Sequence, residues 1–159
     1  MRYGQWMLAV LVCAAVLVAG CQEPAAQESA GLEQRTLITS EDFGLIAGRQ
    51  WTLERMVADG TEYALEGRRP FVQLQSDGTI AGYASVNRFG GTLGLDKQGR
   101  ITLSPLATTR MAGPVDRMEQ EETFLRALGN IDRLSVAGDR LAMQSLDGTM
   151  ELVFVEGMW

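Results

Sequence analysis

Residues 114–130 read PVDRMEQEETFLRALGN, and this stretch decides the fold class. Its apolar residues recur at the spacing of one helix face, at Val115, Met118, Phe124, Leu125 and Leu128. A proline at the start and Gly-Asn at the end are typical helix boundaries. The stretch therefore predicts one amphipathic helix, whose apolar face must pack on another element.

The rest of the domain has the pattern of an antiparallel β-protein. Turn signals such as Asp59-Gly60, Gly90-Gly91 and Asp147-Gly148 separate short segments in which apolar and polar residues alternate. The predicted strands are residues 51–57, 71–75, 79–83, 92–95, 100–106, 133–136, 140–145 and 150–155. We expect an α+β fold: an antiparallel, barrel-like sheet of about eight short strands with the helix packed against it.

Composition excludes several classes of function. The chain has 159 residues, 14 Lys plus Arg, 20 Asp plus Glu and no histidine, which gives a net charge of -6. Without histidine, this chain alone cannot build an imidazole metal site or a Ser-His-Asp nucleophile. The acidic balance argues against nucleic acid, because phosphate binding needs a basic surface. We expect no metal and no cofactor.

The first residues indicate export. Arg2 precedes residues 7–19, which carry no polar side chain and are shorter than the roughly 20 residues of a bilayer span. The run ends in Val18-Ala19-Gly20-Cys21, which resembles the bacterial lipobox. We predict a lipoprotein signal peptide in residues 1–20 and an acylated Cys21. A plain signal peptide cut near Ala19 is the alternative.

Residues 21–47 are expected to be the lipidated cysteine and a flexible tether, because they are polar, small and aperiodic. The folded domain is then residues 48–159. Gln22, rather than Asp, follows the cysteine, which favours the outer membrane with the domain in the periplasm. Cleavage before Cys21 removes Cys13, so the mature chain has no disulfide of its own.

Three stretches carry a family resemblance: residues 51–53 (WTL), residues 82–91 (GYASVNRFGG), and residues 107–114 (ATTRMAGP) followed by residues 121–125 (EETFL). Together they resemble the META/HslJ family (heat-shock HslJ, DUF306) of bacterial envelope lipoproteins. Where that family has two cysteines, this chain has Val86 and Gly113. The resemblance therefore implies that the family's disulfide bridge is absent here as a unit.

Glu121 is the first candidate site residue, because a helical projection places it near the middle of the apolar face. A buried carboxylate is costly unless it is paired, and Arg110, in the connection before the helix, is the expected partner. We interpret this pair as structural. A ligand or partner site that uses the same charges is the alternative, and catalysis is a third reading.

Asn87 and Arg88 lie beside Gly90-Gly91, where turn formation is the simplest explanation. Alternatively, Arg88 and Arg110 form a small exposed polar patch at one end of the sheet. Met111 and Met118 are expected to be packing residues. Paired acids are the only conventional catalytic option, yet acids near a helix N-terminus are favoured for stability alone, so we expect no enzyme.

The family resemblance implies a non-enzymatic envelope role, linked in some members to stress or drug tolerance. We therefore expect a lipid-anchored interaction module that contacts another envelope protein or the cell wall. A small carrier that holds an apolar ligand inside the sheet is the alternative.

Overall fold

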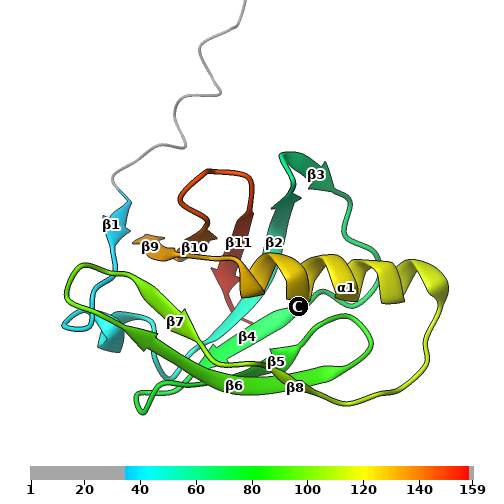
Figure 1. Cartoon of the computed structure of the whole chain (residues 1–159), viewed down its shortest axis with the longest axis horizontal. Coiled ribbons are helices and arrows are strands. Elements are labelled where there is room, and N and C mark those ends of the chain that lie inside the picture. Colours follow the sequence, from blue (N-terminus) through cyan, green and yellow to red (C-terminus); the bar gives the residue numbers. More distant parts are fainter. Residues whose placement is uncertain (1–34, 158–159) are drawn as a thin grey trace, which may run out of the picture. The chain divides into compact units, whose positions relative to one another are not determined.

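The structure is a computed structural model and describes residues 35–157, with one helix and eleven short strands (Figure 1). The elements are β1 Thr36–Leu37, the 3-10 turn η2 Phe43–Leu45, β2 Gln50–Ala58, β3 Thr61–Tyr63, β4 Phe71–Leu74, β5 Thr79–Tyr83, β6 Arg88–Leu95, β7 Ile101–Leu103, β8 Ala107–Thr108, α1 Val115–Gly129, β9 Arg133–Ala137, β10 Arg140–Gln144 and β11 Glu151–Glu156. The fold is α+β, as the sequence predicted.

The strands form one antiparallel sheet in the order β1-β9-β10-β11-β2-β4-β5-β6-β7, with β3 added to β2 and β8 added to β6. The predicted barrel-like closure is wrong, because the end strands β1 and β7 share no ladder. They have only two and three residues. The two ends of the sheet are joined instead by single backbone hydrogen bonds, from Ser40 N to Asp96 O (3.1 Å) and from Ile101 N to Asp132 O (3.0 Å).

Each of the eight predicted segments coincides with a strand, but β1, β3 and β8 were missed. All three have two or three residues and are exposed, so they carry no alternating apolar pattern. β6 begins at Arg88 rather than at residue 92, because Gly90 and Gly91 are strand residues that pair with β5. Short exposed strands therefore account for most of the difference between the predicted and observed sheet.

The helix packs on β2 and β11, and Figure 1 shows it crossing one face of the curved sheet. Its buried residues are Gln120, Glu121, Phe124, Ala127 and Leu128. Val115 and Met118, which were expected on the apolar face, are exposed instead. The helix therefore turns two polar side chains, Gln120 and Glu121, toward the sheet.

The interior is filled by large side chains. Trp51, Phe124 and Phe154 are fully buried. The ring of Phe124 packs against those of Phe89 and Phe154, with centroids 5.9 and 6.4 Å away. Burial of each such ring stabilises the fold by about 1.5–3 kcal/mol.

The chain ahead of residue 48 also contributes to this core. Ile38 and Ile46 are fully buried, and Trp51 Nε1 donates a hydrogen bond to Ile46 O at 2.9 Å. Residues 36–47, which we expected to belong to a flexible tether, thus pack on the sheet. The predicted signal peptide, Cys21 and the first part of the tether lie outside the described residues. Between residues 35 and 157, no helix has the length and hydropathy to cross a membrane.

Candidate functional site

Glu121 is 7% exposed, and its carboxylate accepts three hydrogen bonds from the loop between β5 and β6. Its Oε2 accepts from the backbone N–H groups of Val86 (2.9 Å) and Asn87 (2.6 Å), and its Oε1 accepts from Asn87 Nδ2 (2.8 Å). Donors of this kind stabilise a buried charge without a cation. The side chain of α1 thereby fixes the loop of a distant hairpin.

The side chain of Asn87 also bonds to the segment that precedes the helix. Its Oδ1 accepts from Met111 N (2.7 Å) and from Thr109 Oγ1 (2.8 Å), and its Nδ2 also donates to Met111 O (3.2 Å). The side-chain amide is therefore bonded at both ends. We call Glu121, Asn87, Thr109 and Met111, with the N–H of Val86, the Glu121 network.

The predicted ion pair between Glu121 and Arg110 is wrong. Among residues 35–157, Arg110 forms neither an ion pair nor a hydrogen bond with Glu121, and its side chain is exposed. Backbone and amide donors take the place that was assigned to the guanidinium. The structure brings Asn87 and Glu121 together and leaves the side chains of Arg88 and Arg110 at the surface.

Two further helix residues hold the same loop and were missed by the sequence analysis. Arg117 donates from Nε to Ser85 Oγ (3.0 Å) and from Nη2 to Ser85 O (3.0 Å). Gln120 Nε2 donates to Ser85 Oγ at 2.7 Å. Ser85 is buried and has φ 135°, a strained conformation for a residue with a side chain, and these contacts hold it there. The sequence did contain one signal for these two residues. Arg117 and Gln120 are spaced so that they lie on the same helix face as Glu121.

The network presents exposed side chains from a fixed backbone. Arg88 N donates to Thr109 Oγ1 (3.1 Å), and Thr109 N donates to Arg88 O (3.0 Å). Both backbone groups of Met111 bond to Asn87, yet its side chain is 56% exposed, so it is not the packing residue that we expected. Val115, at the start of α1, is 74% exposed.

Val86 and Gly113 lie in direct contact beside this network. A Cβ placed on Gly113 would lie 3.4 Å from Val86 Cβ and 2.7 Å from Val86 Cγ2. Cβ atoms in disulfides are about 3.5–4.5 Å apart. The two positions are thus close to bridging geometry, and Val86 fills the space that a side chain at residue 113 would need.

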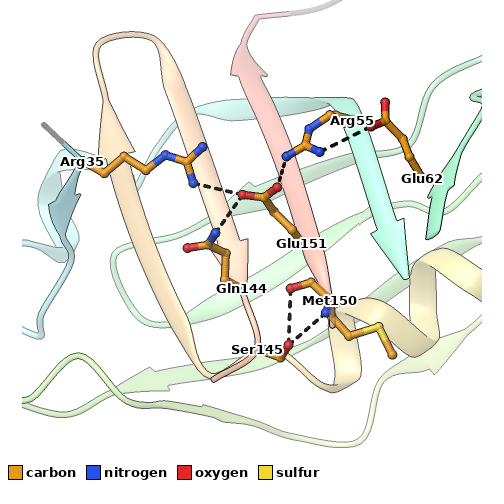
Figure 2. Close-up of polar contacts among 7 residues, drawn as sticks. All are labelled: Arg35, Arg55, Glu62, Gln144, Ser145, Met150 and Glu151. Carbon is orange, nitrogen blue, oxygen red and sulfur yellow. Dashed lines mark hydrogen bonds and ion pairs between the residues drawn. The ribbon is translucent and has the colours of Figure 1, made fainter. Parts of the chain in front are cut away.

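A second carboxylate, Glu151, is half-buried on the outer face of the sheet and is paired with cations. Figure 2 shows it between Arg35 and Arg55, with Gln144 beside it. Arg35 Nη1 donates at 3.0 Å and Gln144 Nε2 at 2.7 Å, and Arg55 reaches on to Glu62. The carboxylate side chain is 14% exposed. We call Glu151, Arg35, Arg55 and Gln144 the Glu151 network.

Among the carboxyl groups whose pKa is lowered are Glu54 and Asp147. A hydrogen bond from Arg140 lowers the pKa of Glu54. In the β10–β11 turn, hydrogen bonds from Ser145 and Thr149 lower the pKa of Asp147 to about 2. Both groups are ionised at neutral pH and fix surface structure rather than a reactive centre.

Two grooves open beside the C-terminal end of α1. The larger, of about 650 Å³, is lined by residues that include Asn130, Asp132 and Asp147. The smaller, of about 390 Å³, lies between the β7–β8 connection and Leu125. Most of the residues that line them are exposed or half-buried, so these are surface features rather than cavities inside the core. Within the described chain, no three His, Cys, Asp or Glu side chains gather as a metal site.

Fold and site together define a small α+β domain in which one helix fixes two loops of a curved antiparallel sheet. Residues 44–158 match the model of the META domain, so the chain belongs to the META domain family. A comparison with curated proteins gives no match.

Solved structures share this fold. The protein is 26% identical to one from Burkholderia xenovorans solved by NMR, with a TM-score of 0.62 over 77% of this chain and 90% of that one. A second NMR structure is 21% identical, with a TM-score of 0.53 over 74% and 94% of the two chains. A crystal structure of a DUF4847 family protein from Bacteroides vulgatus is 12% identical, with a TM-score of 0.54 over 73% and 97%. The last two are similar in fold alone.

Proposed function

We propose that the protein is a lipid-anchored component of the bacterial cell envelope that acts as a non-enzymatic interaction module. The anchor is an acylated Cys21 at the outer membrane, with the META domain facing the periplasm. The lipobox-like ending of residues 18–21 supports the anchor. A stress- or envelope-related role follows from the family resemblance.

One observation carries the interaction module. The Glu121 network holds the backbones of two loops, while Arg88, Arg110 and Met111 point exposed side chains outward from them. A surface that is rigid before binding loses little conformational entropy when a partner docks. The buried hydrogen bonds of the Glu121 network thus fix the backbone that carries these exposed side chains.

The same contacts support a non-enzymatic role. Both oxygens of Glu121 accept hydrogen bonds from the β5–β6 loop, so the carboxylate is engaged rather than presented to a substrate. The carrier reading has less support, because fully buried rings such as those of Trp51, Phe124 and Phe154 fill the space between helix and sheet.

Photocrosslinking in living cells tests the module. A crosslinking amino acid is placed at residue 88 or residue 110 of the membrane-anchored protein. Lys97 is the matched control, because it is exposed in the turn at the opposite end of β6. We expect a discrete protein adduct at residues 88 and 110 but not at residue 97. Adducts with lipid or small apolar molecules alone would support the carrier instead, and no adduct at either site would contradict the module.

Metabolic labelling tests the anchor separately. A fatty acid with a clickable group should label the wild-type protein, and Cys21→Ser should abolish the label and release the protein from the membrane fraction. Labelling that persists in Cys21→Ser would exclude the proposed lipid site.

A further inference from the structure

A row of side chains on the outer face of the sheet continues the exposed surface beyond Arg88. The register pairs Phe71 of β4 with Tyr83 of β5, and Tyr83 with Arg88 of β6. Directly paired residues of neighbouring strands point to the same face. Val72 and Gly82, which alternate with these residues, are buried, so the row lies on the outer face.

Arg68 lies over this row. Its guanidinium carbon is 4.6 Å from the centroid of the Tyr83 ring and 5.8 Å from that of Phe71, and the two rings stack at 6.2 Å. Arg117 Nη2 donates to Arg68 O at 2.7 Å, which fixes the backbone below. Stacking on aromatic rings holds a guanidinium in place while leaving its N–H edge available.

The described residues give Arg68, Arg88 and Arg110 no carboxylate within ion-pair distance. In residues 35–157, the ion pairs involve Arg35, Arg49, Arg55, Arg126 and Arg140. None of those pairs includes Arg68, Arg88 or Arg110, although the chain is acidic overall. The nearby carboxylate of Glu121 is buried and bonded to N–H groups. Arg68, Arg88 and Arg110 are thus exposed cations outside the ion pairs of the described residues, and the register brings Arg68 and Arg88 to the same aromatic row.

The composition and position of the surface favour a protein partner. Arginine, tyrosine and methionine are enriched in protein interfaces, and exposed Met111 adds an apolar side chain on a fixed backbone. Arg68 covers the rings, so they are not open faces for stacking a sugar. β1, where the described chain begins, is followed by Ser40, whose N–H donates to Asp96 O just beyond the C-terminal end of β6, whereas Arg88 lies at the start of that strand.

We propose that Arg68, Arg88, Arg110 and Met111 form a docking surface for an acidic segment of a partner protein. This inference rests on the proposed interaction module and names the chemistry of its partner. Carboxylates of the segment would pair with the guanidinium groups, and an apolar side chain of the partner would contact Met111.

The test combines crosslinking with charge reversal in the membrane-anchored protein in cells. A crosslinker at residue 110 is introduced into wild-type, Arg68→Glu, Arg88→Glu and Lys97→Glu backgrounds. Loss of one close charge pair at an interface should lower the yield of the adduct roughly tenfold in the first two variants. Lys97→Glu carries the same charge change elsewhere and should leave the yield unchanged. The crosslinked peptide of the partner should be rich in Asp and Glu.

The outcomes separate this inference from the proposed function. A protein adduct whose yield is unchanged in Arg68→Glu and Arg88→Glu, or which maps to a neutral or basic segment, keeps the module but overturns the acidic partner. An adduct with glycan or lipid overturns the inference as well. No adduct at residue 88 or residue 110 of the otherwise wild-type protein contradicts the module itself. Thermal unfolding of each purified variant must remain cooperative at the wild-type midpoint, so that a lost adduct reports on docking.

Discussion

Two carboxylates of this domain, the buried Glu121 and the half-buried Glu151, are held in opposite ways. Glu121 lies between helix and sheet and accepts hydrogen bonds from two backbone N–H groups and one side-chain amide. Glu151 lies on the outer face of the sheet and is neutralised by two arginines that are themselves 32% and 39% exposed. The inner carboxylate fixes the backbone of a loop, whereas the outer one joins side chains across strands. We therefore expect the inner contact to contribute far more to stability and to the shape of the surface.

Removing the inner acceptor should give the largest effect. Glu121→Ala leaves the backbone N–H groups of Val86 and Asn87 without their acceptor and removes one of the two bonds of Asn87 Nδ2, and we expect a loss of about 3–5 kcal/mol in the free energy of unfolding. Urea unfolding measures this loss. Glu122→Ala is the matched control, because Glu122 is exposed on the next position of α1 and should change stability by less than about 0.5 kcal/mol. Similar values for the two variants would contradict the stabilising role of the buried Glu121 carboxylate.

A disulfide beside the Glu121 network should give the next largest effect, with the opposite sign. Val86→Cys combined with Gly113→Cys should form a bridge on oxidation, because the two Cβ positions are close to disulfide spacing. The oxidised variant should be about 2–4 kcal/mol more stable than its reduced form. Thiol titration measures whether the bridge forms, and urea unfolding with and without reductant measures the gain in stability. Free thiols that persist under oxidant would show that the two loops do not meet as described.

The outer network should respond more weakly. Glu151→Gln keeps the shape of the side chain and removes its charge, and we expect a loss of about 1 kcal/mol, because its arginines remain solvated. The loss should shrink in 1 M salt, where exposed charges are screened. A salt-independent loss comparable to that of Glu121→Ala would mean that the outer pair is as important to the fold as the inner one.

The smallest effect on stability should come from removing the Asp147 carboxylate, and it should change with pH only under acidic conditions. The pKa of Asp147 is lowered to about 2 by hydrogen bonds from Ser145 and Thr149. A lowered pKa stabilises the fold above the unfolded value of about 4, and this contribution is lost as the pH falls through about 2. The stability of Asp147→Asn should therefore depend less on pH between 4 and 2 than that of the wild type. Urea unfolding at several pH values measures this dependence. If the free energy of unfolding changed equally with pH in the wild type and in Asp147→Asn, the prediction would be wrong.

The parts of the fold that follow from periodicity could be read from the sequence. The helix near residues 114–130 and eight strands were predicted because their apolar residues repeat at regular spacing. β1, β3 and β8 could not be, because two or three exposed residues carry no such pattern. Barrel closure failed for a similar reason: whether two short end strands pair is decided by tertiary packing, which the pattern of each strand does not report.

The site was harder to predict than the fold. A helical projection placed Glu121 on the apolar face, and the carboxylate is buried there. Its partners could not be inferred, because the N–H groups of Val86 and Asn87 exist at every non-proline residue and leave no signature. Sequence reasoning therefore searched for a charged side chain and chose Arg110, which the structure leaves at the surface.

Amide hydrogen exchange at Val86 and Asn87 tests most directly the claim that Glu121 holds the surface loop. These two N–H groups donate to a carboxylate of the helix rather than to a strand neighbour, so their protection reports on this contact alone. We predict that in the wild-type protein both amides exchange as slowly as those of the β2–β11 ladder, and that in Glu121→Gln they exchange much faster while the ladder amides still report a folded core. Rapid exchange of both amides in the wild type, or equal protection in Glu121→Gln, would contradict the account.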